Sequence, residues 1–111
     1  MSLERYLEDI DLASYTVKSN LFRPPYARVT LSQMRAVARR YKIVLWSIVS
    51  RDYNRKITKE MCLRGVLPHI EAGSIILFHD SEKSFANMSY VLPKTLEHIE
   101  QLGLKCKAIE L

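Results

Sequence analysis

The chain has 111 residues, 48% of them hydrophobic, and a formal net charge of +5. This length is enough for one domain with its own core, so we predict that residues 1–111 form a single domain. No apolar stretch approaches the ~20 residues of a membrane-spanning helix, so we expect no membrane partner. The first residues lead directly into charged, helix-compatible sequence, which predicts no signal peptide and, for a complete chain, a cytoplasmic protein.

The positive charge raises the question of a nucleic-acid partner. A basic cluster is formed by Arg35, Arg39, Arg40 and Lys42. Arg35 and Arg39 share one face of the expected helix, but the neighbouring aromatic residues form no stacking series and no nucleic-acid-binding motif is present. We therefore expect a solvated helix face and no nucleic-acid partner, with a basic nucleic-acid binder kept as the third alternative.

The first half of the chain predicts a helix, a short extended piece and a second helix. Apolar residues at intervals of three and four predict an amphipathic helix over residues 3–19. An extended piece at 21–23 follows, because Pro24 disfavours helical geometry in the residue before it. The Thr30–Gln33 segment fits a capping box that begins a helix through about Tyr41.

The middle of the chain predicts a buried strand and a third helix. Residues 43–46 are apolar and read as the strand. Thr58 can cap a helix through about Ile70, and Gly73 lies beyond its end. Pro68 should make the last turn of this helix irregular. The two cysteines lack the spacing of a metal or redox site, so we expect two reduced, buried thiols at Cys62 and Cys106.

The last third predicts a strand, a helix and a final strand. Residues 74–79 form the strand, and residues 85–102 form a helix that Gly103 ends. Pro93 must sit early in this helix or bend it. A strand at residues 104–109 completes the pattern.

This alternation predicts an α/β fold with about four parallel strands joined by right-handed crossovers. Four strands are about half of a closed (β/α) barrel, so we predict a partial barrel. The two outer strands of such a sheet would expose unpaired N–H and C=O groups. A second copy of the chain, or a missing partner segment, is the expected cover for these edges.

The run Ser74–Phe78 ends in His79 and Asp80, at the carboxyl end of the expected strand. Its continuous apolar sequence predicts a strand with both faces covered. Ligands bind at the carboxyl ends of parallel strands in α/β folds, which makes His79 a candidate catalytic residue. The alternative is a surface histidine in a turn.

Four segments in this order resemble one family: Phe22–Tyr26, Trp46, Ser50–Tyr53 and Leu77–His79. Together they resemble the C-terminal half of the polysaccharide deacetylases, metal-dependent hydrolases with a NodB-like domain, also called carbohydrate esterase family four. The resemblance covers nearly the whole chain. It implies hydrolysis of the C–N amide bond that joins an acetyl group to a sugar, with an N-acetylated polysaccharide or oligosaccharide as partner.

The resemblance implies three catalytic residues. His79 would be the general acid that protonates the departing amine, and Asp52 would pair with it. Arg23 would tether the aspartate that acts as catalytic base. Amide hydrolysis must expel a poor leaving group, and a carboxylate beside a histidine favours the protonated ring that can supply the proton. The alternative for Arg23 and Asp52 is a structural ion pair.

Four further residues are implied in substrate binding. The backbone N–H of Tyr26 would hold the oxyanion, which a turn stiffened by proline orients in advance. Tyr53, with Trp46, would form the wall of a groove for the sugar, and Leu77 would line the pocket for the acetyl methyl group. Core packing is an equal alternative for Trp46 and Tyr53.

The sequence departs from the family at the metal site. The complete family domain uses a divalent metal, with zinc expected, held by an Asp-Asp pair and a His-x-x-x-His pair that have no counterpart here. His69, His79 and His98 are too far apart for that spacing, and Val49 replaces a family aspartate. We therefore expect no metal ligands in this chain and no activity from it alone.

Three explanations fit a chain with half of the motifs: a cut fragment, a truncated gene or a degenerate family member. Met1–Leu3 resembles the start that an expression vector leaves, which favours the first two. A non-catalytic carbohydrate-binding or assembly module, which kept the aromatic groove wall and lost the metal site, is the alternative function.

Overall fold

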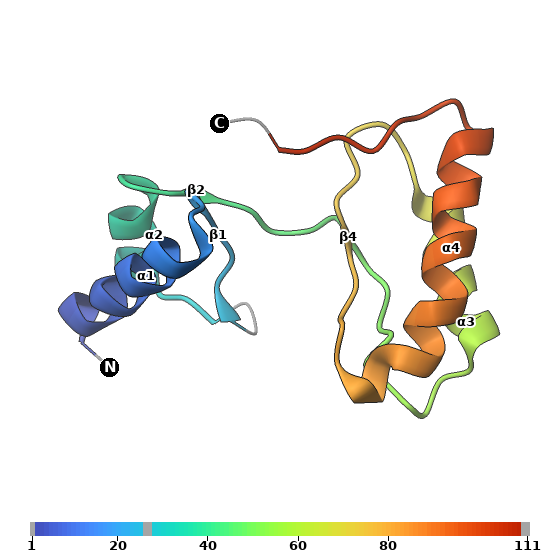
Figure 1. The fold of residues 1–111 in the computed structure, drawn as a ribbon, viewed down its shortest axis with the longest axis horizontal. Helices are drawn as coiled ribbons and strands as arrows, with labels where there is room; N and C mark the ends of the chain where they lie inside the picture. The colour runs from blue at the N-terminus through green and yellow to red at the C-terminus, as the bar shows by residue number, and fades with distance from the viewer. Residues whose placement is uncertain (1, 26–27, 110–111) are drawn as a thin grey trace. The chain divides into compact units, whose positions relative to one another are not determined.

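The computed structural model describes residues 2–25 and 28–109. They form a mixed α/β structure that divides into two compact units, Met1–Leu45 with Ile109–Leu111, and Trp46–Ala108 (Figure 1). Four α-helices and short parallel strands make up the described part of the chain. No helix in this described part is long and apolar enough to cross a membrane.

The first unit contains the elements α1 (Leu3–Val17), β1 (Leu21–Phe22), α2 (Leu31–Ala38) and β2 (Lys42–Ile43). Strands β1 and β2 are parallel, with Leu21 opposite Lys42. The predicted capping box of α2 is confirmed, because the Thr30 hydroxyl accepts a bond from the Gln33 N–H and the Gln33 side chain accepts one from the Thr30 N–H. Ile10, Pro24 and Val37 are among the buried apolar side chains of the described residues of this unit.

The second unit contains the elements β3 (Ile48–Val49), α3 (Lys59–Arg64), the 3₁₀ helix η2 (Leu67–His69), β4 (Ile76–Leu77), the 3₁₀ helix η3 (Glu82–Ser84) and α4 (Phe85–Gln101). Strands β3 and β4 are parallel, with Ile48 opposite Ile76 and Val49 opposite Leu77. Thr58 caps α3 as predicted, since its hydroxyl accepts the Met61 N–H.

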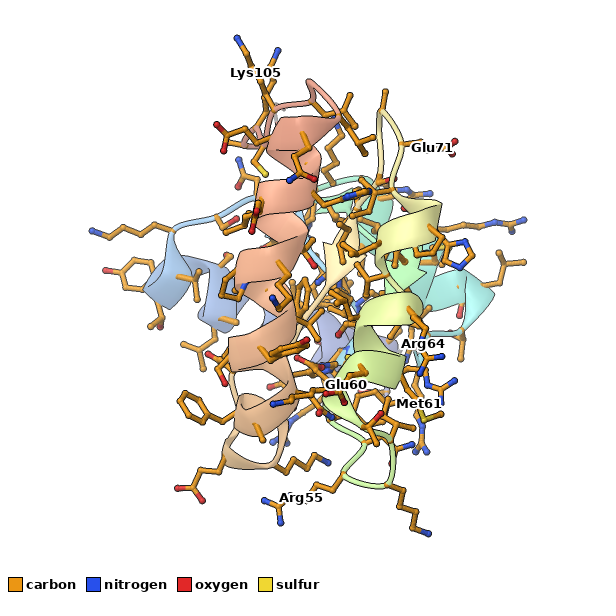
Figure 2. The ribbon with its side chains drawn as sticks, turned by 90° about the vertical axis from the view of Figure 1, so that its right-hand side faces the viewer. Arg55, Glu60, Met61, Arg64, Glu71 and Lys105 are labelled. Carbon is orange, nitrogen blue, oxygen red and sulfur yellow. The ribbon has the colours of Figure 1, made fainter. Side chains whose placement is uncertain are left out.

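The core of the second unit forms where α3, α4 and β3 meet. Ile48, Cys62, Val66 and Val91 are buried there, and Ile76 and Phe78 are among the half-buried residues that pack against them. Figure 2 shows α3 and α4 side by side, with Glu60, Met61 and Arg64 projecting outward from α3. The core therefore fixes β3 and β4 against the two helices.

The strands differ from prediction in position and length. The strand expected at 43–46 ends at Ile43, and a separate strand that the pattern did not predict, β3, follows at Ile48–Val49. The apolar run 43–46 is divided between the two units, because the boundary between them falls after Leu45. The strand expected at 104–109 does not form, since residues 105–109 are solvent-exposed and make no ladder.

Other predictions were wrong in detail. The helix expected through Ile70 ends at Arg64, and η2 with Pro68 in its first turn follows. The run Ser74–Phe78 is half-buried rather than covered on both faces, with Ile76 and Phe78 packed against the core. Pro93 lies in the interior of α4 and not early in it, so of the two expected outcomes the bend at Pro93 stays a prediction.

The prediction of two buried, reduced cysteines was right for one of them. Cys62 is free and buried as expected, whereas Cys106 is free and exposed in the segment after α4. The strand predicted for that segment is not formed, and residues 105–109 are exposed.

Candidate active site

The parallel pairing of β3 and β4 brings Asp52 and His79 together. Asp52 lies three residues after Val49, and His79 lies two residues after Leu77, the residue opposite Val49. Both side chains therefore leave the same, carboxyl end of one small sheet. This is the end at which parallel sheets present functional groups.

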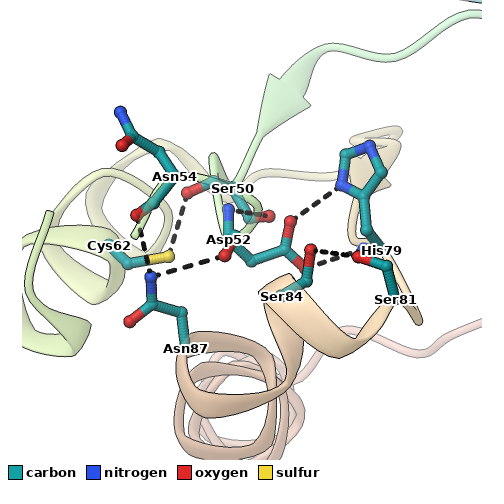
Figure 3. A network of polar contacts seen from close by, with 8 residues as sticks. All are labelled: Ser50, Asp52, Asn54, Cys62, His79, Ser81, Ser84 and Asn87. Carbon is teal, nitrogen blue, oxygen red and sulfur yellow. Dashed lines mark hydrogen bonds and ion pairs between the residues drawn. The ribbon is translucent and has the colours of Figure 1, made fainter. Parts of the chain in front are cut away.

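The Asp52 carboxylate holds His79 at two points. Its Oδ2 accepts the backbone N–H of His79 at 2.7 Å, and its Oδ1 lies 2.8 Å from Nδ1 of the ring (Figure 3). The carboxylate is completely buried, whereas the His79 side chain is 39% exposed. A buried carboxylate needs such donors, because burial removes the water that would otherwise solvate it.

This geometry separates the two ring nitrogens of His79. An ionised carboxylate only accepts hydrogen bonds, so the nitrogen facing it, Nδ1, carries a proton. The other nitrogen, Nε2, points away from Asp52 in Figure 3. The ring is thus oriented by one nitrogen and free to exchange a proton through the other.

Tyr53 gives the His79 ring its second contact. The two rings meet edge to face, with centroids 5.3 Å apart and planes at 77°. The Tyr53 side chain is 41% exposed, and Lys83 Nζ lies 5.8 Å from the centre of its ring. Tyr53 is therefore an exposed aromatic residue beside the histidine.

Leu77 lies on the same side of β4 as His79. Ile76 and Phe78 pack against the core, and side chains alternate along a strand, so Leu77 and His79 fall on the opposite face. Val49, opposite Leu77 in register, is 36% exposed on that face. An apolar surface thus adjoins the histidine.

Three groups hold the backbone around Asp52. The Ser50 hydroxyl accepts the Asp52 N–H at 3.3 Å, and the Cys62 thiol donates to the Ser50 carbonyl at 2.9 Å (Figure 3). The Asn87 amide donates to the carbonyls of Asp52 and Asn54. Burial, and next the nearby Asp52 carboxylate, raise the pKa of the Cys62 thiol, while Arg51 acts in the opposite direction.

These supporting residues were missed from the sequence. Of these residues, only Asn87 belongs to a sequence pattern that could have indicated a supporting role. Asn87, Val91 and Thr95 follow one another at intervals of four, and all three are buried on α4. A polar side chain on the buried stripe of a helix needs a partner inside the protein. Ser50 and Cys62 carry no comparable pattern.

The remaining predicted residues lie apart from this pair in the chain. Arg23 belongs to the first unit, where its Nε and Nη2 donate to the carbonyls of Val44 and Leu45 at 3.0 and 3.1 Å. Trp46 is half-buried and follows β2 without belonging to it. Tyr26 lies outside the described residues. The roles of these three residues stay predictions.

The residues of this structure do not fit a metal of the kind that the resemblance implies. Within residues 2–25 and 28–109, no group of three His, Cys, Asp or Glu side chains could hold a metal ion. Asp52 is already committed to His79 through both carboxylate oxygens. No step of a reaction is therefore assigned to a metal held by these residues.

Two solved structures share this fold. A peptidoglycan N-acetylglucosamine deacetylase, solved with a naphthalenyl N-oxidanyl-benzamide, matches 78% of the chain at a TM-score of 0.70 and 22% identity. A family 4 carbohydrate esterase from Streptomyces lividans, solved with acetate, matches 82% of the chain at a TM-score of 0.61 and 24% identity. No protein-family model matches the chain, and no curated protein does.

The fold is thus that of a part of the deacetylases, as the sequence motifs predicted. The matches span 41% of the first neighbour's chain and 45% of the second's. The chain therefore corresponds to less than half of either protein's length, and it shares their mixed α/β architecture.

Proposed function

We propose that this chain supplies the proton-donor side of a hydrolase that removes acetyl groups from N-acetylated polysaccharide sugars. His79 is the general acid, and Asp52 orients its ring. The observation that carries the proposal is the buried Asp52 carboxylate 2.8 Å from Nδ1 of a half-exposed histidine, at the carboxyl end of paired strands. The shared fold of two deacetylase-type structures supports it.

The chemistry needs a proton donor at the leaving group. Water adds to the acetyl carbonyl, the C–N bond of the resulting tetrahedral intermediate breaks, and acetate and a free sugar amine are the products. An amine leaves as a neutral molecule only if its nitrogen gains a proton as the bond breaks. Nε2 of protonated His79 donates that proton, while Asp52 keeps Nδ1 paired throughout.

The surroundings of His79 suit an acetylated sugar. Leu77 offers an apolar surface for the acetyl methyl group, and the exposed ring of Tyr53 offers a stacking face for the sugar. Arg23, Tyr26 and Trp46 complete the proposed set, with the base tether, the oxyanion donor and the groove wall as their roles.

The activation of water requires groups that the described residues do not provide. The proposal therefore includes a divalent metal, zinc by family resemblance, with ligands supplied by a complementary polypeptide. That polypeptide would also pair with the open edges of the two-stranded sheets β1–β2 and β3–β4. The chain alone is expected to release no acetate.

A chimera tests the proposal. This chain replaces the matching part of the Streptomyces lividans esterase, zinc is added, and acetate release from chito-oligosaccharides is measured. Release should depend on His79, with His79→Ala slowing it about 100- to 10,000-fold. His98→Ala, a change on the half-buried C-terminal part of α4, is the matched control and should leave the rate unchanged. A folded chimera without release, or full activity in His79→Ala, would defeat the proposal.

A carbohydrate-binding module is the second candidate, because the Tyr53 ring is 41% exposed beside the site. Exposed aromatic rings bind sugars without catalysis by stacking against their apolar faces. Titration of the chain alone with chito-oligosaccharides separates the two functions. Binding that Tyr53→Ala abolishes, together with an inactive chimera, would favour the module.

A further inference from the structure

A buried amide on α4 is bonded to the backbone of the segment whose Asp52 and Tyr53 side chains contact the His79 ring. Asn87 is 8% exposed, and its Nδ2 donates to the backbone carbonyl of Asp52 at 3.4 Å and to that of Asn54 at 3.3 Å. The residue between these carbonyls is Tyr53. One side chain thus fastens the backbone on both sides of Tyr53 and directly at Asp52 (Figure 3).

His79 depends on this segment for its orientation. Its ring contacts the Asp52 carboxylate at 2.8 Å and the Tyr53 ring at 5.3 Å, and both partners belong to residues 52–53. The segment leaves strand β3 through Arg51, whose φ of 61° lies in the left-handed region that non-glycine residues rarely adopt. Surrounding contacts must hold such a turn in place.

The position of Asn87 makes it suited to that task. It lies in the first turn of α4, on the stripe that continues through Val91 into the core. Asn87 therefore connects the Asp52–Asn54 turn to a helix that is anchored in the core through Val91. The Asp52 carbonyl, in a buried contact, and the Asn54 carbonyl, in a part-buried one, both receive a donor from this amide, which lowers the cost of leaving them unpaired.

We propose that Asn87 is a positioning residue that sets the tautomer and orientation of His79 by holding the Asp52–Asn54 turn. The importance of Asn87 for deacetylation rests on the proposed function, whereas its effect on the His79 ring is independent of that function. With Asn87 in place, Asp52 keeps the proton on Nδ1 and leaves Nε2 for exchange. Without it, the turn moves, and the ring adopts the Nε2–H tautomer that a free histidine prefers.

The test is ¹⁵N NMR of the His79 ring in the full chain, at a pH where its ring is neutral. Wild type should show a protonated Nδ1 and an unprotonated Nε2. In Asn87→Ala the Nε2 resonance should shift toward the protonated position, and Asn87→Gln, which keeps the donor, should recover part of the wild-type signal. Val91→Ala is the control, because it weakens the same helix in the core without touching the turn.

The wild-type protein gives a second readout if Asn87→Ala does not fold. The two Asn87 side-chain amide protons should be resolved from one another and exchange with water more slowly than those of Asn20, which is exposed. A folded Asn87→Ala with an unchanged His79 tautomer, or Asn87 amide protons that exchange as fast as those of Asn20, would overturn the proposal. Neither readout involves hydrolysis, so an inactive chimera leaves this test intact.

Discussion

The exchange of Asp52 for asparagine should destabilise the second unit by about 2 kcal/mol. In wild type, the carboxylate makes two hydrogen bonds to His79, at 2.7 and 2.8 Å, and is fully buried. Hydrogen bonds to a charged group contribute about 1.5–3 kcal/mol each, and neutral ones about 0.5–1.5 kcal/mol. Asparagine has the same shape: its oxygen can accept the His79 N–H, and its NH₂ can donate to Nδ1 once the ring proton moves to Nε2. Both contacts then become neutral bonds, so the loss is about 1 kcal/mol per bond.

Asp11→Asn is the matched control. Asp11 lies in the first unit and is bonded to Arg40 at 2.8 Å and to Tyr41 at 2.6 Å, but the Asp11 and Arg40 side chains are 46% and 58% exposed. Exposed ion pairs contribute about 0–1 kcal/mol, because water already solvates both charges. The same chemical change should therefore cost less in this unit.

Native-state amide exchange measures the local stability of each unit separately. The amides of α4 report on Asp52→Asn, and those of α1 report on Asp11→Asn. The opening free energy of α4 should fall by about 2 kcal/mol, and that of α1 by less than about 1 kcal/mol. Equal losses in the two variants, or a loss below about 0.5 kcal/mol in Asp52→Asn, would refute the reasoning that the buried pair differs from the exposed one.

Four further predictions concern single residues. Cys106 should react with a thiol reagent in the folded chain while Cys62 reacts only on unfolding, and equal rates would contradict the burial of Cys62. Burial raises the pKa of the Cys62 thiol in the folded protein above its ordinary value of 9.0. Below pH 9.0 the thiol is protonated in both the folded and the unfolded protein, and above pH 9.0 the unfolded protein loses this proton first. The urea midpoint of the wild type should therefore fall as the pH rises from about 8 to about 10, and the part of this fall that is due to Cys62 should be absent in Cys62→Ala. Thr30→Ala removes the cap of α2 and should cost about 1 kcal/mol in urea unfolding, with Ser89→Ala, exposed on α4, as a neutral control. Gly103→Ala places a side chain at a φ of 74° and should cost about 1 kcal/mol, whereas a neutral change would show that the turn relaxes.

The helices were predictable because their signals are local. The capping box at Thr30 and the cap at Thr58 appear in the structure as the sequence indicated. The strands were harder, since a short apolar run becomes a strand only when a partner lies beside it. Ile48–Val49 finds that partner in β4, whereas residues 104–109 find none, and residues 105–109 stay exposed.

The candidate site was partly predictable for the same reason. His79 and Asp52 each follow a strand, and strand pairing alone brings them to one place. Asn87 contacts the Asp52 turn across 35 residues of sequence, through an amide on a helix whose local pattern predicts only a buried face. Contacts of this kind follow from tertiary packing and leave little trace in a single sequence.

The central claim is that His79 donates a proton to the departing amine. A comparison of two substrates whose leaving groups differ in their need for a proton tests this claim most directly. Rates of the zinc-loaded chimera and its His79→Ala variant are compared on an N-acetylated chito-oligosaccharide and on p-nitrophenyl acetate. Nitrophenolate can leave without gaining a proton, whereas a sugar amine must gain one as it leaves. The account predicts a loss of about 100- to 10,000-fold on the amide and of less than about 10-fold on the ester. Equal losses on the two substrates would contradict it.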